Sequence, residues 1–137
     1  MNKLVFIFLL VCVGCKDEDP GLSSPEGKWA YTTPDNKIAV TFEVIKTPSG
    51  DFDIQNQTMK INGVATNAEK EVVGFTATSF EKIRINANDA LAVYPFNIVF
   101  DDGKLSGDFM SITVPTATYT YPWGTTNSLA DITIQRF

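Results

Sequence analysis

The sequence predicts an all-β fold in a single domain. Apolar and polar side chains alternate along most of the chain after Gly27, and turn segments with glycine or proline recur at intervals of roughly ten residues. Between residues 37 and 44, for instance, Ile38, Val40 and Phe42 share one face, and the residues between them face the other way. No segment of this body has a convincing helical period. Short alternating strands with such turns are typical of a β-sandwich or a β-barrel.

The strands expected next show the same alternation. Phe52 and Ile54 face inward in the segment D-F-D-I, and the apolar phase then changes before Met59, which predicts a bulge or a break near Asn56. Further strands are expected in V-V-G-F-T-A-T, I-R-I, P-F-N-I-V-F, K-L-S-G-D-F-M-S-I-T-V, T-A-T-Y-T-Y and A-D-I-T-I-Q-R-F. The domain at residues 27–137 should therefore contain about eight or nine antiparallel strands.

The segment D-D-G-K at residues 101–104 predicts a tight hairpin turn. An Asp-Gly pair favours the turn whose twist matches the twist of the two strands that it joins. The strand before this segment and the strand after it are therefore expected to be neighbours.

The composition limits the possible functions. A chain of 137 residues is long enough to bury a core without disulfide bonds. The formal net charge is −5 and no basic cluster is present, which argues against a nucleic-acid partner. The sequence contains no histidine, so the commonest general base and the commonest metal ligand are both missing.

Residues 1–14 have the pattern of an export signal. Lys3 precedes an apolar run from Leu4 to Val13, and ten residues in a helix would rise about 15 Å, half the thickness of a hydrocarbon core. This run is too short for a comfortable membrane span, so we expect a signal peptide that is removed.

The two cysteines of the chain, Cys12 and Cys15, lie at the end of this run. The tetrapeptide C-V-G-C resembles the lipobox of bacterial lipoproteins, with Cys12 in place of the usual leucine. The resemblance implies that Cys15 is acylated and becomes the first residue of the mature chain. The alternatives are a C-x-x-C redox or metal motif, which the apolar surroundings disfavour, and a plain secretory signal with an incidental cysteine.

The residues after Cys15 combine charge with spacer chemistry. The segment K-D-E-D resembles the signal with which Bacteroidota send lipoproteins to the cell surface, and the alternative is a solvated acidic tether. Residues 15–26, which include P-G-L-S-S-P, are expected to form a flexible spacer behind the lipidated cysteine. The expected location is the outer membrane, with the protein held by covalent lipid on the cell surface or, alternatively, on the periplasmic face.

Gly27, Lys28 and Trp29 resemble the G-x-W motif of lipocalin-like barrels. In that family the tryptophan plugs one end of the barrel beneath a basic residue of the last strand, and Arg136 matches that residue here. The resemblance implies a lipocalin-like barrel in which the first and last strands meet. An immunoglobulin-like sandwich is the alternative, because its short alternating strands would give the same pattern.

No catalytic or metal-binding constellation is recognisable. The nucleophile motif G-x-S-x-G is absent, as is a glycine-rich phosphate loop. Asp51 and Asp53 flank an inward phenylalanine and so face solvent, while Asp101 and Asp102 belong to the expected turn. We therefore predict a protein that is not an enzyme and needs no cofactor or metal, with a two-carboxylate glycosidase as the alternative.

An aromatic segment, T-A-T-Y-T-Y-P-W-G-T-T-N-S, occupies residues 116–128. Tyr119 and Tyr121 share a face of the expected strand, Trp123 follows in a polar loop, and Tyr94 is placed to join them. Exposed aromatic side chains are platforms for sugar rings or partner proteins, so these four residues form the predicted binding site. The alternative is that the tyrosines are core residues and Trp123 covers one end of the domain.

Two functions are consistent with this pattern. The preferred one is a non-catalytic binding protein for a glycan or another small ligand, lipid-anchored and exposed on the surface. The alternative is a protein-interaction or structural component, either an accessory subunit of an envelope complex or a small enzyme inhibitor. The expected partners are therefore the membrane, through the lipid on Cys15, and either a glycan or an envelope protein.

Overall fold

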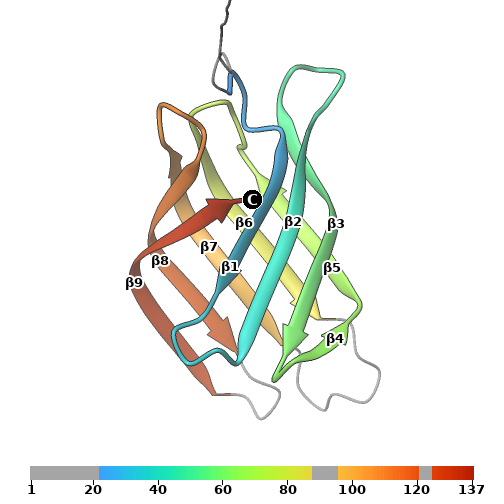
Figure 1. Cartoon of the computed structure of the whole chain (residues 1–137), viewed down its shortest axis with the longest axis vertical. Helices are drawn as coiled ribbons and strands as arrows, with labels where there is room; N and C mark the ends of the chain where they lie inside the picture. Colours follow the sequence, from blue (N-terminus) through green and yellow to red (C-terminus); the bar gives the residue numbers. More distant parts are fainter. Residues whose placement is uncertain (1–21, 88–95, 121–124) are drawn as a thin grey trace, which may run out of the picture.

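The computed structural model of the chain describes residues 22–87, 96–120 and 125–137. All regular secondary structure in these residues is β-strand, which confirms the all-β prediction (Figure 1). The strands are β1 (Gly27–Thr32), β2 (Ile38–Lys46), β3 (Phe52–Ile61), β4 (Val64–Thr66), β5 (Ala68–Val73), β6 (Ser79–Ala87), β7 (Asn97–Leu105), β8 (Ser111–Thr120) and β9 (Thr126–Arg136).

These strands form one sheet in the order β4-β3-β2-β1-β9-β8-β7-β6-β5. Every pair of hydrogen-bonded neighbours is antiparallel. The first and last long strands meet, with Trp29 opposite Arg136 and Ala30 opposite Gln135. This pairing joins the two halves of the sheet, which curls into a nearly closed barrel of lipocalin-like form, as Figure 1 shows. The preferred prediction of a barrel is therefore confirmed over the sandwich.

The barrel has two distinct ends. Residues 22–26 lead into β1 at one of them, which we call the N-terminal end. The β2–β3, β5–β6 and β7–β8 connections lie at this same end, and the β1–β2 and β3–β4 turns lie at the opposite end, called the far end (Figure 1).

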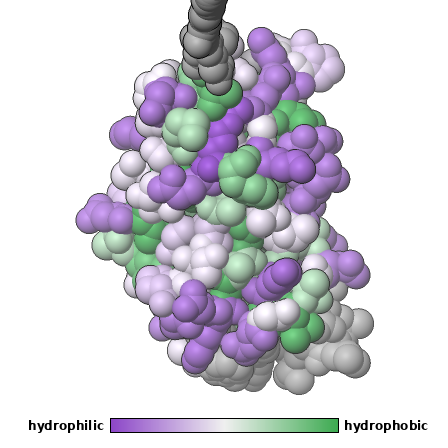
Figure 2. Space-filling view, viewed as in Figure 1, coloured by the Kyte–Doolittle hydropathy of each residue, from purple (hydrophilic) through white to green (hydrophobic). Residues whose placement is uncertain are grey.

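Apolar side chains fill the inside of the barrel. In β2 the alternation is strict, because Ile38, Val40, Phe42 and Val44 are at most 2 % exposed while the residues between them are only partly covered. Removing each such side chain from water contributes about 1.5–3 kcal/mol to folding. The predicted inward face of this segment is confirmed, and on the side of the molecule seen in Figure 2 hydrophilic and near-neutral side chains surround scattered apolar ones.

The predicted irregularity near Asn56 is a β-bulge. Thr41 pairs with Thr58 and Glu43 pairs with Gln55, so two residues of β3 lie opposite one residue of β2. Asn56 has a φ of 53°, a left-handed conformation that asparagine tolerates better than most residues. The bulge changes the phase of β3, so that residues on both sides of it face the core.

The predicted hairpin turn at residues 101–104 is wrong. These residues continue β7, and the chain reverses later, where Ser106 N donates a hydrogen bond to Ser111 O at 2.9 Å. Gly103 lies directly opposite Phe80 of β6, and a Cβ atom at Gly103 would come within 2.2 Å of the Phe80 ring. The glycine therefore makes room for a cross-strand aromatic ring, which is a different role from opening a turn.

Trp29 and Arg136 close the N-terminal end of the barrel. The Trp29 ring is fully buried, and its Nε1 donates a hydrogen bond to the Pro25 carbonyl at 2.9 Å. The guanidinium carbon of Arg136 lies 5.4 Å from the centre of that ring. Its Nη1 donates to the carbonyls of Ser24 at 3.0 Å and Phe109 at 3.1 Å. The predicted contact between the G-x-W tryptophan and Arg136 is confirmed, and two residues of the expected spacer are attached to the barrel.

Candidate ligand cleft

The barrel wall is interrupted between β3 and β5. At the far end β3 pairs with β4, from Met59 opposite Thr66 to Ile61 opposite Val64. Beyond this point β5 pairs with β6, and the ladders of the described residues contain no β3–β5 pair. At the N-terminal end Phe52 N donates a hydrogen bond to Phe75 O at 3.0 Å, which joins the two edges again. The result is a slit in the wall that is closed at both of its ends.

Side chains bridge this slit where a backbone ladder is missing. Lys70 Nζ of β5 forms an ion pair with Asp53 Oδ2 at 2.8 Å and donates a hydrogen bond to the Ile54 carbonyl. Ile54 N donates to Asp53 Oδ1 at 2.7 Å. Further along, Gln57 Nε2 donates to the Ala68 carbonyl at 3.1 Å. These contacts satisfy backbone groups that an open strand edge would leave available for another chain.

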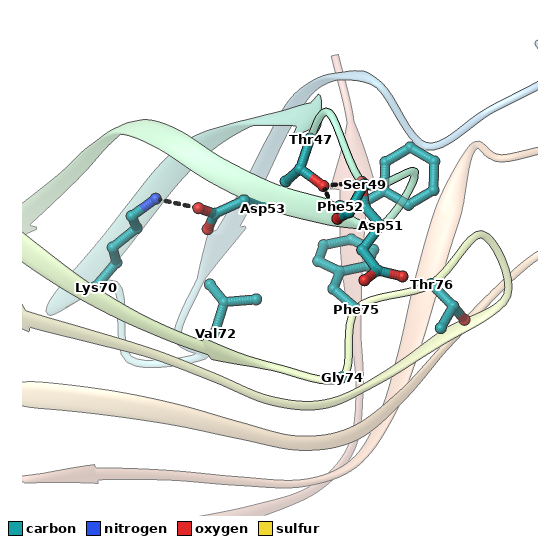
Figure 3. Close-up of a pocket in the computed structure, with 10 residues that line it drawn as sticks. All are labelled: Thr47, Ser49, Asp51, Phe52, Asp53, Lys70, Val72, Gly74, Phe75 and Thr76. Atoms are coloured by element: carbon teal, nitrogen blue, oxygen red, sulfur yellow. Dashed lines mark hydrogen bonds and ion pairs between the residues drawn. The ribbon is translucent and has the colours of Figure 1, made fainter.

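A cleft of about 490 Å³, which we call the slit cleft, lies over the slit, toward the N-terminal end (Figure 3). The β2–β3 connection forms one side of it and the start of the β5–β6 connection forms the other. Phe52 and Phe75 lie beneath, with their ring centres 5.9 Å apart, and they are only 8 % and 2 % exposed. Because these rings are almost covered, the accessible lining of the cleft is mainly polar.

Hydroxyl groups and a carboxylate line the rim of this cleft. Thr47 Oγ1 lies 2.9 Å from Ser49 Oγ, and Thr76 Oγ1 on the other side donates to the Ser79 carbonyl at 3.2 Å. Among the described residues, no hydrogen bond or ion pair involves the exposed carboxylate of Asp51. Figure 3 shows this carboxylate pointing across the cleft, toward the side that carries Thr76. The rim therefore offers an uncommitted acceptor beside hydroxyls that can both donate and accept.

The second carboxylate of the cleft, Asp53, is already engaged. Partial burial raises its pKa, but the hydrogen bonds from Lys70 and from Ile54 N, together with the charge of Lys70, outweigh this effect. The pKa of Asp53 consequently lies below its ordinary value, and the group is a carboxylate at neutral pH. Asp51 and Asp53 both face outward from β3, as predicted, and only Asp51 is left for a ligand.

A second, smaller depression of about 240 Å³ lies on the outer wall over β1, β2 and β3. Its lining includes Lys28, Glu43 and Phe137, and the Phe137 side chain is 70 % exposed. Glu43 Oε1 accepts hydrogen bonds from Gln55 Nε2 at 3.0 Å and Asn56 Nδ2 at 2.9 Å, which lower the pKa of Glu43. Because its carboxylate is already satisfied, this depression has less to offer a ligand than the slit cleft.

The structure describes only one of the residues of the predicted aromatic site. Tyr119 lies inside the barrel wall, 6 % exposed, opposite Asn127 of β9. Burial raises the pKa of Tyr31, and the nearby Tyr119 adds to that shift. The other predicted binding residues, Tyr94, Tyr121 and Trp123, and the predicted lipidation site Cys15 lie outside the described residues.

The sequence prediction missed the slit cleft. The polar segment T-P-S-G-D at residues 47–51 signals a turn, and Lys70 fits an alternating strand. Neither signal shows that β3 and β5 separate, because alternation assigns side chains to a face and says nothing about which edges pair. In the described ranges 22–87, 96–120 and 125–137, no group of three potential metal ligands is found. No helix in these ranges is long and apolar enough to cross a membrane.

Comparison with known proteins gives no relative for this chain, since no family model, no curated protein and no solved structure matches it.

Proposed function

We propose that this protein is a lipid-anchored binding protein of the outer membrane that holds a neutral, hydroxyl-rich ligand such as a glycan in the slit cleft, without catalysis. The lipobox-like sequence around Cys15 supports the anchor, and the K-D-E-D segment supports export to the cell surface. The cleft supports the binding function. Its volume of 490 Å³ lies within the range of about 300–1,000 Å³ that is common for small-ligand sites.

The observation that carries the proposal is the uncommitted carboxylate of Asp51. It lies beside the hydroxyls of Thr47 and Ser49 and across the cleft from Thr76. A sugar presents neighbouring hydroxyls, each of which donates and accepts, and a carboxylate accepts two such donors strongly. Lys70 is already bound to Asp53 and Ile54, so the cleft residues that the structure describes offer no free cation with which to attract an anionic ligand.

The arrangement favours binding over catalysis. A hydrolase that uses two carboxylates needs one of them protonated near neutral pH, and the contacts of Asp53 lower its pKa instead. The cleft thus contains one free carboxylate and one that is held in an ion pair, which suits a site that positions hydroxyl groups.

The test is a glycan array with the detergent-solubilised full chain, followed by calorimetry on any sugar that binds. Asp51→Asn should weaken binding about ten- to hundredfold, because a charge-assisted hydrogen bond contributes about 1.5–3 kcal/mol. Asp102→Asn is the matched control, since it removes one exposed carboxylate on β7 and should leave the affinity unchanged. Equal affinities of the two variants would place the site elsewhere, and a chain that binds no sugar would contradict the proposal.

A further inference from the structure

The slit cleft lies at the same end of the barrel as the point where the chain enters it. Gly27 of β1 pairs with Val44 of β2, and Val44 pairs with Ile54 of β3, so these three residues form one row across the wall. Neighbouring strands are about 4.8 Å apart, which places Ile54 roughly 10 Å from Gly27. The cleft residues 51–53 lie beside this row or beyond it, toward the N-terminal end. Figure 1 shows the β2–β3 connection beside the segment that leads into β1.

The chain that leads into this end is held to the barrel. Pro25 is buried, its carbonyl accepts the Trp29 indole N–H, and the Ser24 carbonyl accepts Arg136 Nη1. The spacer is therefore attached to the barrel from Ser24 onward. From Cys15 to Ser24 the chain has nine residues to span, which reach at most about 32 Å when fully extended. A barrel anchored at Cys15 keeps its N-terminal end, and with it the cleft, close to the bilayer surface.

We propose that the ligand of the slit cleft is the sugar headgroup of a glycolipid in the same membrane that holds the acyl chains of Cys15. This inference rests on the proposed function, since it needs both the lipid anchor and a sugar-binding cleft. The polar rim suits a headgroup, and the short reach of the spacer suits a ligand that lies at the membrane surface. A glycolipid in the same leaflet meets the cleft at an effective concentration in the millimolar range, so that modest affinity is enough.

The position of the cleft on the barrel also favours a membrane-bound ligand over a soluble one. A protein that collects free sugars gains from a site at the end that points away from the membrane, whereas here the described turns of the far end, β1–β2 and β3–β4, carry no part of the cleft. The two sides of the cleft that carry hydroxyl groups, at residues 47–51 and 74–76, both belong to the N-terminal end.

The experiment uses the lipidated full chain in phosphatidylcholine vesicles with and without a dihexosyl diacylglycerol, after mass spectrometry has established lipid on Cys15. An environment-sensitive dye is attached through Ala77→Cys beside the cleft and, in a matched variant, through Ala65→Cys at the far end. Both alanines are exposed, and the lipidated chain has no other free thiol. The dye at residue 77 should respond to the glycolipid, the dye at residue 65 should not, and Asp51→Asn should remove the response.

The free disaccharide headgroup, added to vesicles that lack the glycolipid, gives the comparison that decides between sources. Half of the response should need at least about tenfold more sugar in free form than in the bilayer, because the anchor concentrates the protein beside the lipid. If both forms act at the same sugar concentration, or only the free sugar acts, the glycolipid inference is overturned while the binding cleft stands. If neither form acts and the glycan array is also empty, the proposed function itself fails.

Discussion

Lys70 of β5 and Asp53 of β3 bridge the gap in the barrel wall, with Nζ and Oδ2 only 2.8 Å apart. The same ammonium group donates a hydrogen bond to the Ile54 carbonyl. One side chain therefore neutralises the charge of Asp53 and satisfies a backbone carbonyl at the edge of β3. This bridge holds the floor of the cleft at the place where the sheet has no ladder. The cleft is therefore a consequence of two strands that part and are joined again by side chains.

The first prediction concerns the pH dependence of this bridge. The folded-state pKa of Asp53 is lowered, so its contribution is present above the unfolded pKa of about 4 and is lost as the pH falls through the lower folded value. Both side chains are about one third exposed, at 32 % and 37 %, and solvent screening limits the contribution to about 1 kcal/mol or less. Urea unfolding should show Asp53→Asn less stable than the native chain near neutral pH, with the difference closing in acid. A difference that stays constant with pH would contradict this assignment.

The second prediction concerns the closed end of the barrel. Arg136→Ala removes the contact with the Trp29 ring and the hydrogen bonds to the Ser24 and Phe109 carbonyls. It should lower the free energy of unfolding by about 1–3 kcal/mol in urea titrations. Arg84→Ala is the control, because Arg84 Nη1 lies 3.6 Å from Glu71 Oε1 in a pair whose side chains are 41 % and 48 % exposed, and it should cost less than about 1 kcal/mol. Equal losses in the two variants would show that the end contact contributes nothing special.

The third prediction concerns Gly103. Gly103→Ala places a methyl group within 2.2 Å of the Phe80 ring, so either the ring or strand β7 must move. The expected loss of stability is about 1–3 kcal/mol, as for other overpacked cores. Gly107→Ala provides the contrast, since nothing lies within 4 Å of a Cβ atom there, and its effect should stay within about 0.5 kcal/mol. Calorimetric melting of both variants measures the difference, and an unchanged melting temperature for Gly103→Ala would refute the packing role.

The fourth prediction concerns the anchor. Cys15→Ala should release the chain from membrane fractions and remove the lipid mass, because no sulfur remains at the proposed acylation position. Cys12→Ala is the matched control and should keep both the lipid and the membrane association. Protease shaving of intact cells then distinguishes the cell surface from the periplasmic face. Lipid that persists in Cys15→Ala would exclude the proposed acylation site.

Local alternation predicted much of the fold. The inward face of β2, the bulge at Asn56 and the contact of Trp29 with Arg136 all follow from patterns within a few residues or from the closure of a barrel. Gly103 shows the limit of such patterns. An Asp-Gly pair favours a turn, yet the space beside Phe80 also requires a glycine, and only the tertiary arrangement decides between them.

The sequence pattern does not predict the cleft, for a related reason. Lys70 and Asp53 are 17 positions apart and both look like ordinary outward residues of alternating strands. Their meeting depends on β5 leaving β3 after the short β4 pairing, and no residue type marks that divergence. Tyr119 shows a further ambiguity of the sequence. An aromatic residue in an alternating strand fits a core position as well as a binding face, and Tyr119 is only 6 % exposed.

Hydrogen–deuterium exchange of the full chain, with and without the sugar that binds best, locates the binding site on the barrel. The slit cleft predicts slower exchange at residues 47–53 and 70–76 in the presence of the sugar, and unchanged exchange in β8 and β9, on the part of the wall away from the slit. Protection confined to β8 and β9, with residues 47–53 and 70–76 unaffected, would contradict the assignment of the binding site to the cleft between β3 and β5.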